Sequence, residues 1–265
     1  MKFLFIVTTS TATIFSLASI GALGQTTNFC DPALCPSGGP HIACNGLSGP
    51  SASCGAGSFE VTMDSTKQAL ITNQHNHLRS RVALGNQNYV TNAFYPPAAR
   101  MATLEWDNEL AHIAATNARR CVFAHDRCRN TATMRAVGQN IAIKMFYGQD
   151  ISDEVLIQGF IDSWFSEYAD SNPSHIASYP ANHQGPAIGH FTQIVSDRSS
   201  RIGCAMVSYI QAPWINKLFV CNYGLTNIIS QPVYVAGPTG SQCQTGTSVH
   251  FSGLCSTSEV VSNNP

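Results

Sequence analysis

Three histidines and one glutamate are the residues of this chain whose types suit them best to acid–base or metal chemistry. His75 stands in "HNHLRSR", His125 in "CVFAHDRC" and His190 in "GHFTQIV", and Glu167 follows Trp164 by three residues. A neutral imidazole can bind zinc or copper, and it exchanges protons near neutral pH. A carboxylate beside it is a candidate general base. These side chains could therefore form a catalytic site, a metal site or a hydrogen-bonded frame.

The first of these histidines favours a structural interpretation. His75 shares one helical face with Leu78 and Val82, so we expect it at the edge of the core, hydrogen-bonded to the backbone. His77 points elsewhere on the same helix and is expected to be solvated.

Glu167 and His125 remain open between two roles. Glu167 lies beside the apolar face marked by Trp164, either as a partly buried hydrogen-bond acceptor or as a site residue. His125 lies between Cys121 and Cys128, where a polar side chain is either a structural hydrogen-bonding group or part of a preorganised site. Sequence spacing does not choose between these roles.

The common catalytic signatures are absent from the sequence. We find no G-x-S-x-G, no H-E-x-x-H, no P-loop and no G-x-G-x-x-G. No C-x-x-C pair occurs either, which argues against a cysteine-rich zinc site. The sequence therefore shows no nucleophile and no oxyanion donor for hydrolysis.

Three amphipathic helices must position these residues. The first begins at Asp64 or Ser65 and ends at Gly85, the second begins at Asp107, and the third follows Ser152. Their predicted buried faces are Ile71, His75, Leu78 and Val82 in the first, Leu110, Ala111, Ala114, Ala118 and Cys121 in the second, and Val155, Leu156, Phe160, Trp164 and Tyr168 in the third.

The second half of the chain is richer in predicted strands. "VGQNIAIKM" indicates a short strand, whereas "TNAFYPPAAR" indicates a loop because its two prolines cannot lie inside a helix. "IGCAMVSYI" and "KLFVCNYG" predict an antiparallel pair joined by a short loop at "QAPWIN". Cys204 and Cys221 could then meet across the ladder or across an adjacent turn.

Ten cysteines and an apolar N-terminus indicate a secreted protein. Residues 1–24 resemble a signal peptide cleaved near Gly24–Gln25, since a positive start precedes an apolar run and small residues. An even number of cysteines in such a chain predicts five disulfides formed in an oxidising compartment. No second long apolar run follows, so we expect no membrane anchor.

The charge of the chain offers no electrostatic argument for binding nucleic acid or an anionic membrane. Only 11% of the 265 residues are charged, and the formal net charge is −1. Without Lys2, 13 basic and 15 acidic side chains remain, giving −2. We therefore expect no nucleic-acid partner.

An ordered set of motifs resembles the CAP superfamily, which comprises cysteine-rich secretory proteins, antigen 5 and pathogenesis-related 1 proteins. The similarity is greatest to the insect antigen 5, or venom-allergen, branch and covers roughly residues 28–225. The motifs are "CDPALCPSGGPHIACN", "HNHLRSRVALG", "LEWDNELAHIAATNARRC", "HDRCRN", "VGQNIA", "GHFTQIV" and "FVCNYG".

This resemblance implies an α+β fold, a three-layer α-β-α sandwich around a small antiparallel sheet. An irregular cysteine-rich arm at 25–63 then precedes a CAP, or SCP, domain at 64–225. A polar extension at 226–265 follows, with Cys243 and Cys255 as its only expected anchors. The implied disulfides are Cys30–Cys44, Cys35–Cys128, Cys54–Cys121 and Cys204–Cys221, which leaves Cys243–Cys255 as a pair beyond the family core.

The resemblance also implies a polar cleft formed in the family by two histidines and two glutamates. The matching residues here are His125, His190 and Glu167, whereas Gln139 in "GQN" replaces the second glutamate. Gln139 keeps the hydrogen-bonding shape but removes one negative charge. His125 and His190 could still hold zinc or another divalent metal weakly, although no cofactor is required.

The function that we expect is that of a secreted, non-enzymatic binding or effector protein. Its partner would be a small apolar ligand of the sterol, fatty acid or eicosanoid class, or an extracellular protein receptor. Apolar helix faces around Phe160 and Trp164 motivate the ligand, and the exposed arm at 30–54 motivates the receptor. The alternative is a divalent-metal-dependent hydrolase that uses His125, His190 and Glu167.

Overall fold

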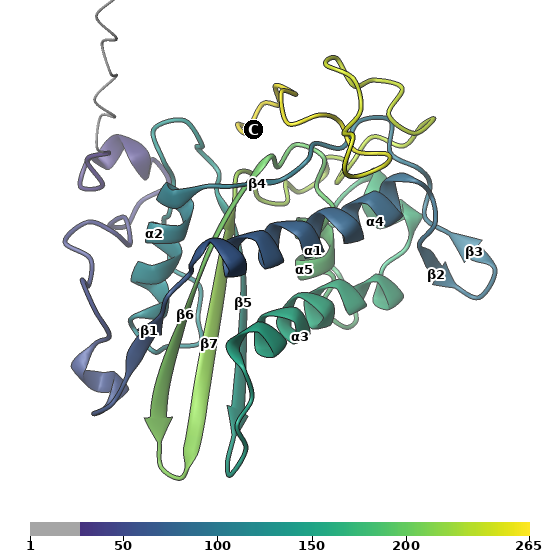
Figure 1. Cartoon of the computed structure of the whole chain (residues 1–265). Coiled ribbons are helices and arrows are strands. Elements are labelled where there is room, and N and C mark those ends of the chain that lie inside the picture. Colours follow the sequence, from purple (N-terminus) through teal and green to yellow (C-terminus); the bar gives the residue numbers. More distant parts are fainter. Residues whose placement is uncertain (1–26) are drawn as a thin grey trace, which may run out of the picture.

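The structure, a computed structural model, describes residues 27–265 and is built around one mixed sheet (Figure 1). The expected signal peptide and its cleavage point near Gly24–Gln25 lie outside the described residues. Within residues 27–265, no helix has both the length and the apolar character needed to cross a membrane.

Two long strands and a third beside them form the centre of the sheet. The strand order is β1-β6-β7-β5, with antiparallel pairing throughout, and the short β4 pairs in parallel with β6. The strands are β1 (Phe59–Val61), β4 (Glu105–Trp106), β5 (Gly138–Phe146), β6 (Arg201–Gln211) and β7 (Trp214–Tyr223), and a separate hairpin contains β2 (Asn88–Val90) and β3 (Ala93–Phe94). The predicted antiparallel pair is confirmed, whereas the parallel partner β4 was not foreseen.

Helices cover both faces of this sheet (Figure 1). Helix α2 packs on β6 and β7 from one side, while α1, α3 and α5 lie on the other. Their bounds are α1 (Ser65–Ala83), α2 (Asn108–Ala118), α3 (Asp153–Ser166), α4 (Pro173–Ala177) and α5 (Gly189–Ile194), with 3₁₀ turns at Pro32–Leu34, Ala52–Cys54 and Glu167–Asp170. The predicted three-layer sandwich is confirmed.

The helices begin where the capping residues predicted. The side chains of Asp64, Asp107 and Ser152 each accept a hydrogen bond from a backbone N–H in the first turn of α1, α2 and α3. Gly85, just past α1, has a φ of +71°, a conformation that glycine adopts without strain. Local chemistry therefore fixes the ends of these helices.

Some predicted buried positions are wrong. Val155 is 57% exposed because α3 buries the stripe that runs from Leu156 and Ile157 towards the C-terminal end of the helix, and Val155 lies outside that stripe. Cys121 lies beyond the end of α2. Asn117, which was not predicted to be buried, is fully enclosed because the segment after α2 folds back over it.

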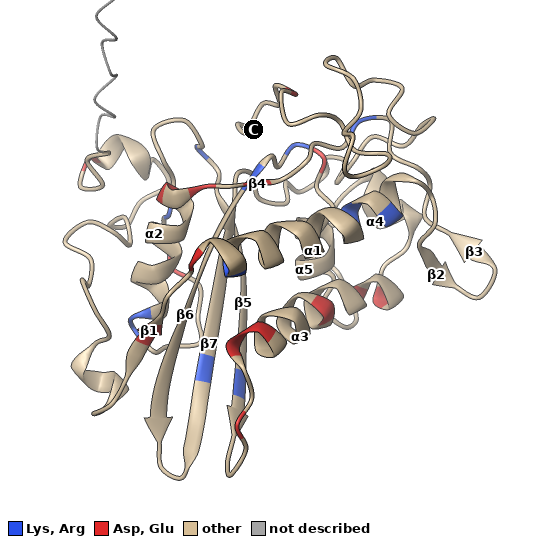
Figure 2. Ribbon diagram, viewed as in Figure 1, with Lys and Arg blue, Asp and Glu red and all other residues tan. Residues whose placement is uncertain are grey.

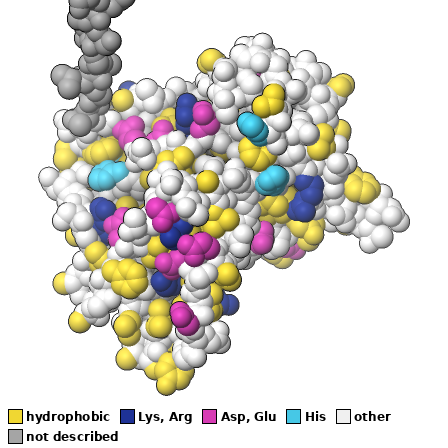
Figure 3. Space-filling model, viewed as in Figure 1, with side chains coloured by type: hydrophobic (Ala, Val, Ile, Leu, Met, Phe, Trp, Pro, Cys, Tyr) yellow, Lys and Arg dark blue, Asp and Glu magenta, His cyan; other side chains and the backbone are white. Residues whose placement is uncertain are grey.

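The connection between β6 and β7 is tighter than predicted. Gln211 pairs with Trp214, so only Ala212 and Pro213 form the turn, and most of "QAPWIN" belongs to the strands. The aromatic rings of Trp214 and Tyr147 meet edge to face beside this turn. Both side chains are exposed. Figure 3 shows hydrophobic side chains at the lower end of the molecule, the end at which Figure 1 places the turn between β6 and β7.

Two of the five disulfides join the arm to the segment that follows α2, and the other three lie within the arm, within the sheet and within the C-terminal segment. The five disulfides join Cys30–Cys44, Cys35–Cys128, Cys54–Cys121, Cys204–Cys221 and Cys243–Cys255, and no free cysteine remains among the described residues. These are the pairs that the family resemblance implies. Cys204 and Cys221 lie directly opposite each other on β6 and β7.

The C-terminal segment is held by more than its disulfide. Val233, Tyr234 and Leu254 are buried in the core, so the expectation that Cys243 and Cys255 would be its only anchors is wrong. Apolar side chains dispersed through a polar sequence formed this contact without showing a periodic pattern. The segment crosses the end of the sandwich beside the N-terminal end of β4 (Figure 1).

A buried carboxylate organises the end of this segment. Glu259 accepts hydrogen bonds from the backbone N–H groups of Gln244 and Thr245 and from the Thr245 hydroxyl, and Arg100 Nε lies 2.6 Å from its Oε1. Burial alone would raise the pKa of Glu259, but these donors outweigh it and lower the pKa to about 2. Figure 2 shows how sparse the charged residues are elsewhere.

Candidate functional site

The turn that contains "GHFTQIV" is held by the carboxylate of Glu167. Glu167 Oε1 accepts a hydrogen bond from His190 Nδ1 over 2.6 Å, and its Oε2 accepts from the backbone N–H groups of His190 and Phe191. The indole ring of Trp164 stacks on the His190 ring, with 6.0 Å between the ring centroids. The 3₁₀ turn after α3 thus fixes both the backbone and the side chain of His190.

This arrangement decides which nitrogen of His190 is free. A carboxylate only accepts hydrogen bonds, so Nδ1 of His190 carries the proton in the neutral ring and Nε2 keeps its lone pair. The same carboxylate is occupied by three donors. Glu167 therefore acts as the orienting partner of His190.

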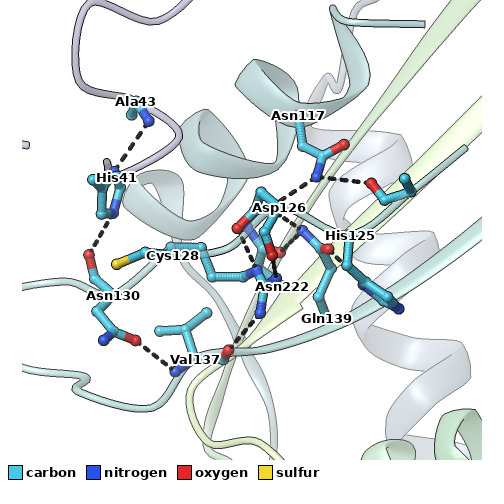
Figure 4. A network of polar contacts seen from close by, with 12 residues as sticks. His41, Ala43, Asn117, His125, Asp126, Cys128, Asn130, Val137, Gln139 and Asn222 are labelled. Atoms are coloured by element: carbon cyan, nitrogen blue, oxygen red, sulfur yellow. Dashed lines mark hydrogen bonds and ion pairs between the residues drawn. The ribbon is translucent and has the colours of Figure 1, made fainter. Parts of the chain in front are cut away.

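His125 is oriented by Gln139 in a comparable way (Figure 4). The Gln139 amide nitrogen donates to Asp126 Oδ2 over 2.8 Å and to Asn222 Oδ1 over 3.0 Å, which sets the direction of the amide. Its Oε1 must then accept from His125 Nδ1, 2.7 Å away. Nε2 of the exposed His125 therefore also keeps a lone pair.

Asp126 is the site residue that sequence reasoning missed. It is buried, it accepts from Asn117 and Gln139, and Arg129 Nε lies 2.9 Å from its Oδ1 in an ion pair that lacks good hydrogen-bond geometry. Burial alone would raise the pKa of Asp126, but the Arg129 charge and the hydrogen bonds outweigh it and lower the pKa. The i, i+3 spacing of acid and arginine in "HDRCRN" was the available signal.

The four predicted cleft residues form two hydrogen-bonded pairs, His125 with Gln139 and His190 with Glu167. Gln139 faces α2, as its bonds to Asp126 and Asn222 show, whereas the next residue, Asn140, contacts the His190 carbonyl on the opposite side. No hydrogen bond between the described residues joins the His125–Gln139 pair to the His190–Glu167 pair. Within residues 27–265, no group of three or more His, Cys, Asp or Glu side chains is arranged to hold a metal ion.

A buried chain of hydrogen bonds connects the His190 turn to α1. Asn140 Nδ2 donates to the His190 carbonyl and to the Tyr223 hydroxyl, which lies 2.9 Å from His75 Nε2. His75 Nδ1 donates to the Ile71 carbonyl, so the predicted backbone bond of this histidine is confirmed. Burial lowers the pKa of His75 to about 4, which keeps the ring neutral at physiological pH.

His77 and His41 complete the histidine inventory near the site. His77 is exposed, as predicted, and its ring meets Phe251 edge to face. His41, in the arm, donates from Nε2 to the Asn130 carbonyl and accepts the Ala43 N–H at Nδ1 (Figure 4). His41 thereby attaches the arm to the loop that follows His125.

The apolar faces expected to hold a ligand are filled by the protein itself. Phe160 and Trp164 are buried and both stack on Phe219 of β7. Open space lies instead in a groove of about 480 Å³ between α1 and α3 and in a pocket of about 450 Å³ between β1 and α2. The groove is lined by Leu70, Asn73, Gln74, His77, Leu78, Gln158 and Asp162.

The amino-acid sequence is similar to those of known proteins. The sequence profile of the cysteine-rich secretory protein family, CAP, matches residues 72–223. The chain is 46% identical to venom allergen-1 of Aedes albopictus over 252 residues, which covers 95% of this chain and 93% of that protein. It is 36% identical to a venom allergen 3 homolog of Dinoponera quadriceps over 211 residues, 78% of this chain and 89% of that protein.

Solved structures share the fold. The crystal structure of NaASP2 with Zn²⁺ superimposes with a TM-score of 0.61 and 26% sequence identity, over 73% of this chain and 96% of that one. The crystal structure of Na-ASP-1 superimposes with a TM-score of 0.64 at 25% identity, over 79% of this chain and 51% of that one. The sandwich fold therefore lies within a known structural family.

Proposed function

Because the chain belongs to the cysteine-rich secretory protein (CAP) family, we propose that it is a secreted, non-enzymatic binding protein. The observation that carries this proposal is the state of Glu167. Its carboxylate accepts three hydrogen bonds from His190 and Phe191, so Glu167 serves to hold the His190 turn in place. The second carboxylate of the family cleft is the neutral amide of Gln139, which holds His125.

The partner that we propose is a small apolar ligand or an extracellular protein. For the ligand, the groove between α1 and α3 is the supporting feature, because its volume of about 480 Å³ suits a small molecule and Leu70 and Leu78 supply apolar surface. The neutral polar side chains around them, such as Asn73 and Gln74, would face the polar end of an amphipathic molecule such as a sterol.

Native mass spectrometry of the protein secreted from insect cells tests the ligand. We expect a retained lipid mass that is lost in Leu78→Lys, which puts a charge into the groove, and kept in the matched control Val249→Lys on an open surface. Protein that is consistently empty would contradict lipid carriage. Lipid retained equally by both variants would place the lipid outside this groove.

A second candidate, a divalent-metal site and the hydrolase built on it, is favoured by one observation. Both His125 and His190 are held as the tautomer whose Nε2 can bind a metal, and each donates its other ring nitrogen to an oxygen, as metal-binding histidines commonly do. These two imidazoles would hold the ion, and a bound zinc would polarise a substrate carbonyl. Two protein ligands make a weaker site than the three typical of catalytic zinc.

Hydrolysis assays separate the two candidates. Diverse peptide and ester substrates, with and without zinc, should give no turnover by the wild type. Turnover that disappears in His190→Ala would overturn the non-enzymatic proposal. Turnover that survives in His190→Ala would assign the activity to another part of the molecule or to a contaminant.

A further inference from the structure

On the edge of the sheet opposite β5, a gap of three residues, Gly203 to Ala205, has no strand beside it. Two short strands pair with the same edge of β6: β4 reaches Ile202, and β1 reaches Met206. Cys204 lies between these positions and has no partner in either register. The gap is formed because β4 leads into α2 and β1 leads into α1, so both chains leave the sheet there.

The backbone of Cys204 points into this gap. In an antiparallel ladder, alternate residues direct their N–H and C=O to opposite edges. Gly224 N donates to the Arg201 carbonyl, so odd-numbered residues of β6 bond to the β7 side. Asp107 N donates to the Ile202 carbonyl, so even-numbered residues bond to the outer side. Cys204 is even-numbered, so its backbone N–H and C=O point to the outer edge of the sheet.

Neither neighbouring strand supplies a hydrogen-bond partner for the N–H or the C=O of Cys204. The next antiparallel partner in the register of β1 would be Met63, but its carbonyl accepts from the Gln68 side chain. The next parallel acceptor after β4 would be the Asp107 carbonyl, which the Ala111 N–H occupies. Among the described residues, the N–H and C=O of Cys204 therefore have no hydrogen-bond partner, although the residue is only 1% exposed.

A pocket opens directly onto this unpaired backbone. It has a volume of about 450 Å³ and is lined by Cys204 and Ala205. Ala111 and Ala115 of α2 form an apolar wall, and Trp106 closes the end towards β4. At the rim, Arg119 Nε lies 2.7 Å from Glu60 Oε2, which leaves the entrance polar. The buried N–H and C=O of Cys204 at the base of this pocket, beside the apolar side chains of Ala111 and Ala115, match a ligand that carries its own amide N–H and C=O.

We propose that this gap binds one residue of an extended peptide segment from a partner protein. The peptide residue would donate its N–H to the Cys204 carbonyl and accept the Cys204 N–H at its own carbonyl, filling the missing position of the ladder. Its neighbours along the peptide would place their side chains on the α2 side, against Ala111 and Ala115, because successive side chains alternate between faces.

This inference goes beyond the proposed function. It assigns a peptide site at the β1 and β4 edge, away from the cleft at β5 and from the groove between α1 and α3. Loss of lipid binding in Leu78→Lys would leave it untouched, and absence of peptide binding would leave the lipid proposal untouched. The two proposals therefore fail separately.

NMR of uniformly ¹⁵N-labelled protein tests the gap in two steps. In the free protein, the Cys204 amide should exchange with solvent deuterium at least tenfold faster than that of Ala205, which bonds to β7. Titration with acetyl-Ala-Leu-Ala-amide should then shift the Cys204 and Ala205 resonances saturably. An analogue with an ester oxygen in place of the leucine N–H should bind at least tenfold more weakly.

Paired variants assign any binding to this pocket. Ala111→Phe fills it and should abolish the shifts, whereas Asn73→Phe, which adds the same ring in the α1–α3 groove, should leave them unchanged. A Cys204 amide as protected as that of Ala205 in the free protein would overturn the proposal, because the gap would already be filled. Absence of shifts at millimolar peptide, or equal shifts in both variants, would overturn it as well.

Discussion

Gln139 Oε1 accepts a hydrogen bond from His125 Nδ1 over 2.7 Å, and the amide nitrogen of Gln139 donates to Asp126. A glutamate at position 139, as in the wider family, would keep the acceptor for His125 but would place a second carboxylate 2.8 Å from Asp126. The neutral amide at position 139 is therefore suited to the buried carboxylate at position 126. The negative charge that is absent at position 139 is carried by Asp126.

Restoring the family carboxylate should destabilise this chain. Gln139→Glu removes two donated hydrogen bonds and sets two carboxyl groups side by side, so one of them should retain a proton near neutral pH. We expect a loss of about 2–3 kcal/mol in the free energy of unfolding, measured by denaturant titration. Asp126→Asn added to Gln139→Glu should recover part of the loss. A single variant as stable as the wild type would contradict this coupling.

Glu167 should contribute more than His190 to the stability of the fold. Glu167→Ala leaves the backbone N–H groups of His190 and Phe191 and the His190 ring without an acceptor, and should cost about 2–4 kcal/mol. His190→Ala keeps both backbone bonds and should cost less. Thermal unfolding of the two variants gives the order, and the reverse order would show that the stacked ring, rather than the carboxylate, holds the turn.

Lowering the pH should change the contributions of two buried groups to the free energy of unfolding in opposite directions. His75, whose pKa falls to about 4, stays neutral when folded, so its contribution is complete above pH 6.5 and is lost as the pH falls towards 4. Burial raises the pKa of Asp197 to about 6, so its contribution is complete below pH 4 and is lost as the pH rises towards 6. Between pH 4 and 6 the two effects largely cancel.

Asp197→Asn should remove the pH dependence that comes from Asp197 and leave that of His75. The variant's free energy of unfolding should fall by up to about 3 kcal/mol between pH 6.5 and 4, whereas these two groups leave the wild type nearly unchanged between pH 4 and 6. Denaturation midpoints at pH 4, 5, 6 and 7 provide the measurement. His75→Gln should show the opposite slope. Parallel curves for the wild type and Asp197→Asn would contradict the assignment.

The C-terminal segment should depend on Glu259 at least as much as on its disulfide. Glu259→Gln removes the charge that pairs with Arg100 and weakens the bonds from Gln244 and Thr245, at a cost of about 2 kcal/mol. We expect faster proteolysis of residues 226–265, followed by mass spectrometry. Because the folded pKa is about 2, the wild type should lose this protection as the pH falls from 4.5 towards 2. Unchanged cleavage would contradict this role.

Local sequence signals predicted the parts of the fold that local chemistry controls. Caps at Asp64, Asp107 and Ser152 located three helices, and β-branched runs located β6 and β7. The role of Tyr223 was not predictable in this way, because the sheet brings its partners His75 and Asn140 together from distant parts of the chain. Asp126 had a local signal in its spacing to Arg129, but its bonds to Asn117 and Gln139 depend on how the chain folds around it.

The apolar residues of α3 show the same limit. Their spacing indicated an apolar face correctly, but it could not tell whether that face would meet a ligand or the sheet. Phe160 and Trp164 stack on Phe219, which lies about sixty residues later in the chain. The choice between ligand and sheet was therefore decided by tertiary packing.

The positions of the disulfides give the two halves of the cleft different sensitivities to reduction. The loop that contains His125 is tied at both ends, through Cys121 to Cys54 and through Cys128 to Cys35. The His190 turn has no such bond and is held by hydrogen bonds to the side chains of Glu167, Asn140 and Asn227. Reducing conditions would therefore loosen the His125 loop and leave the His190 turn in place.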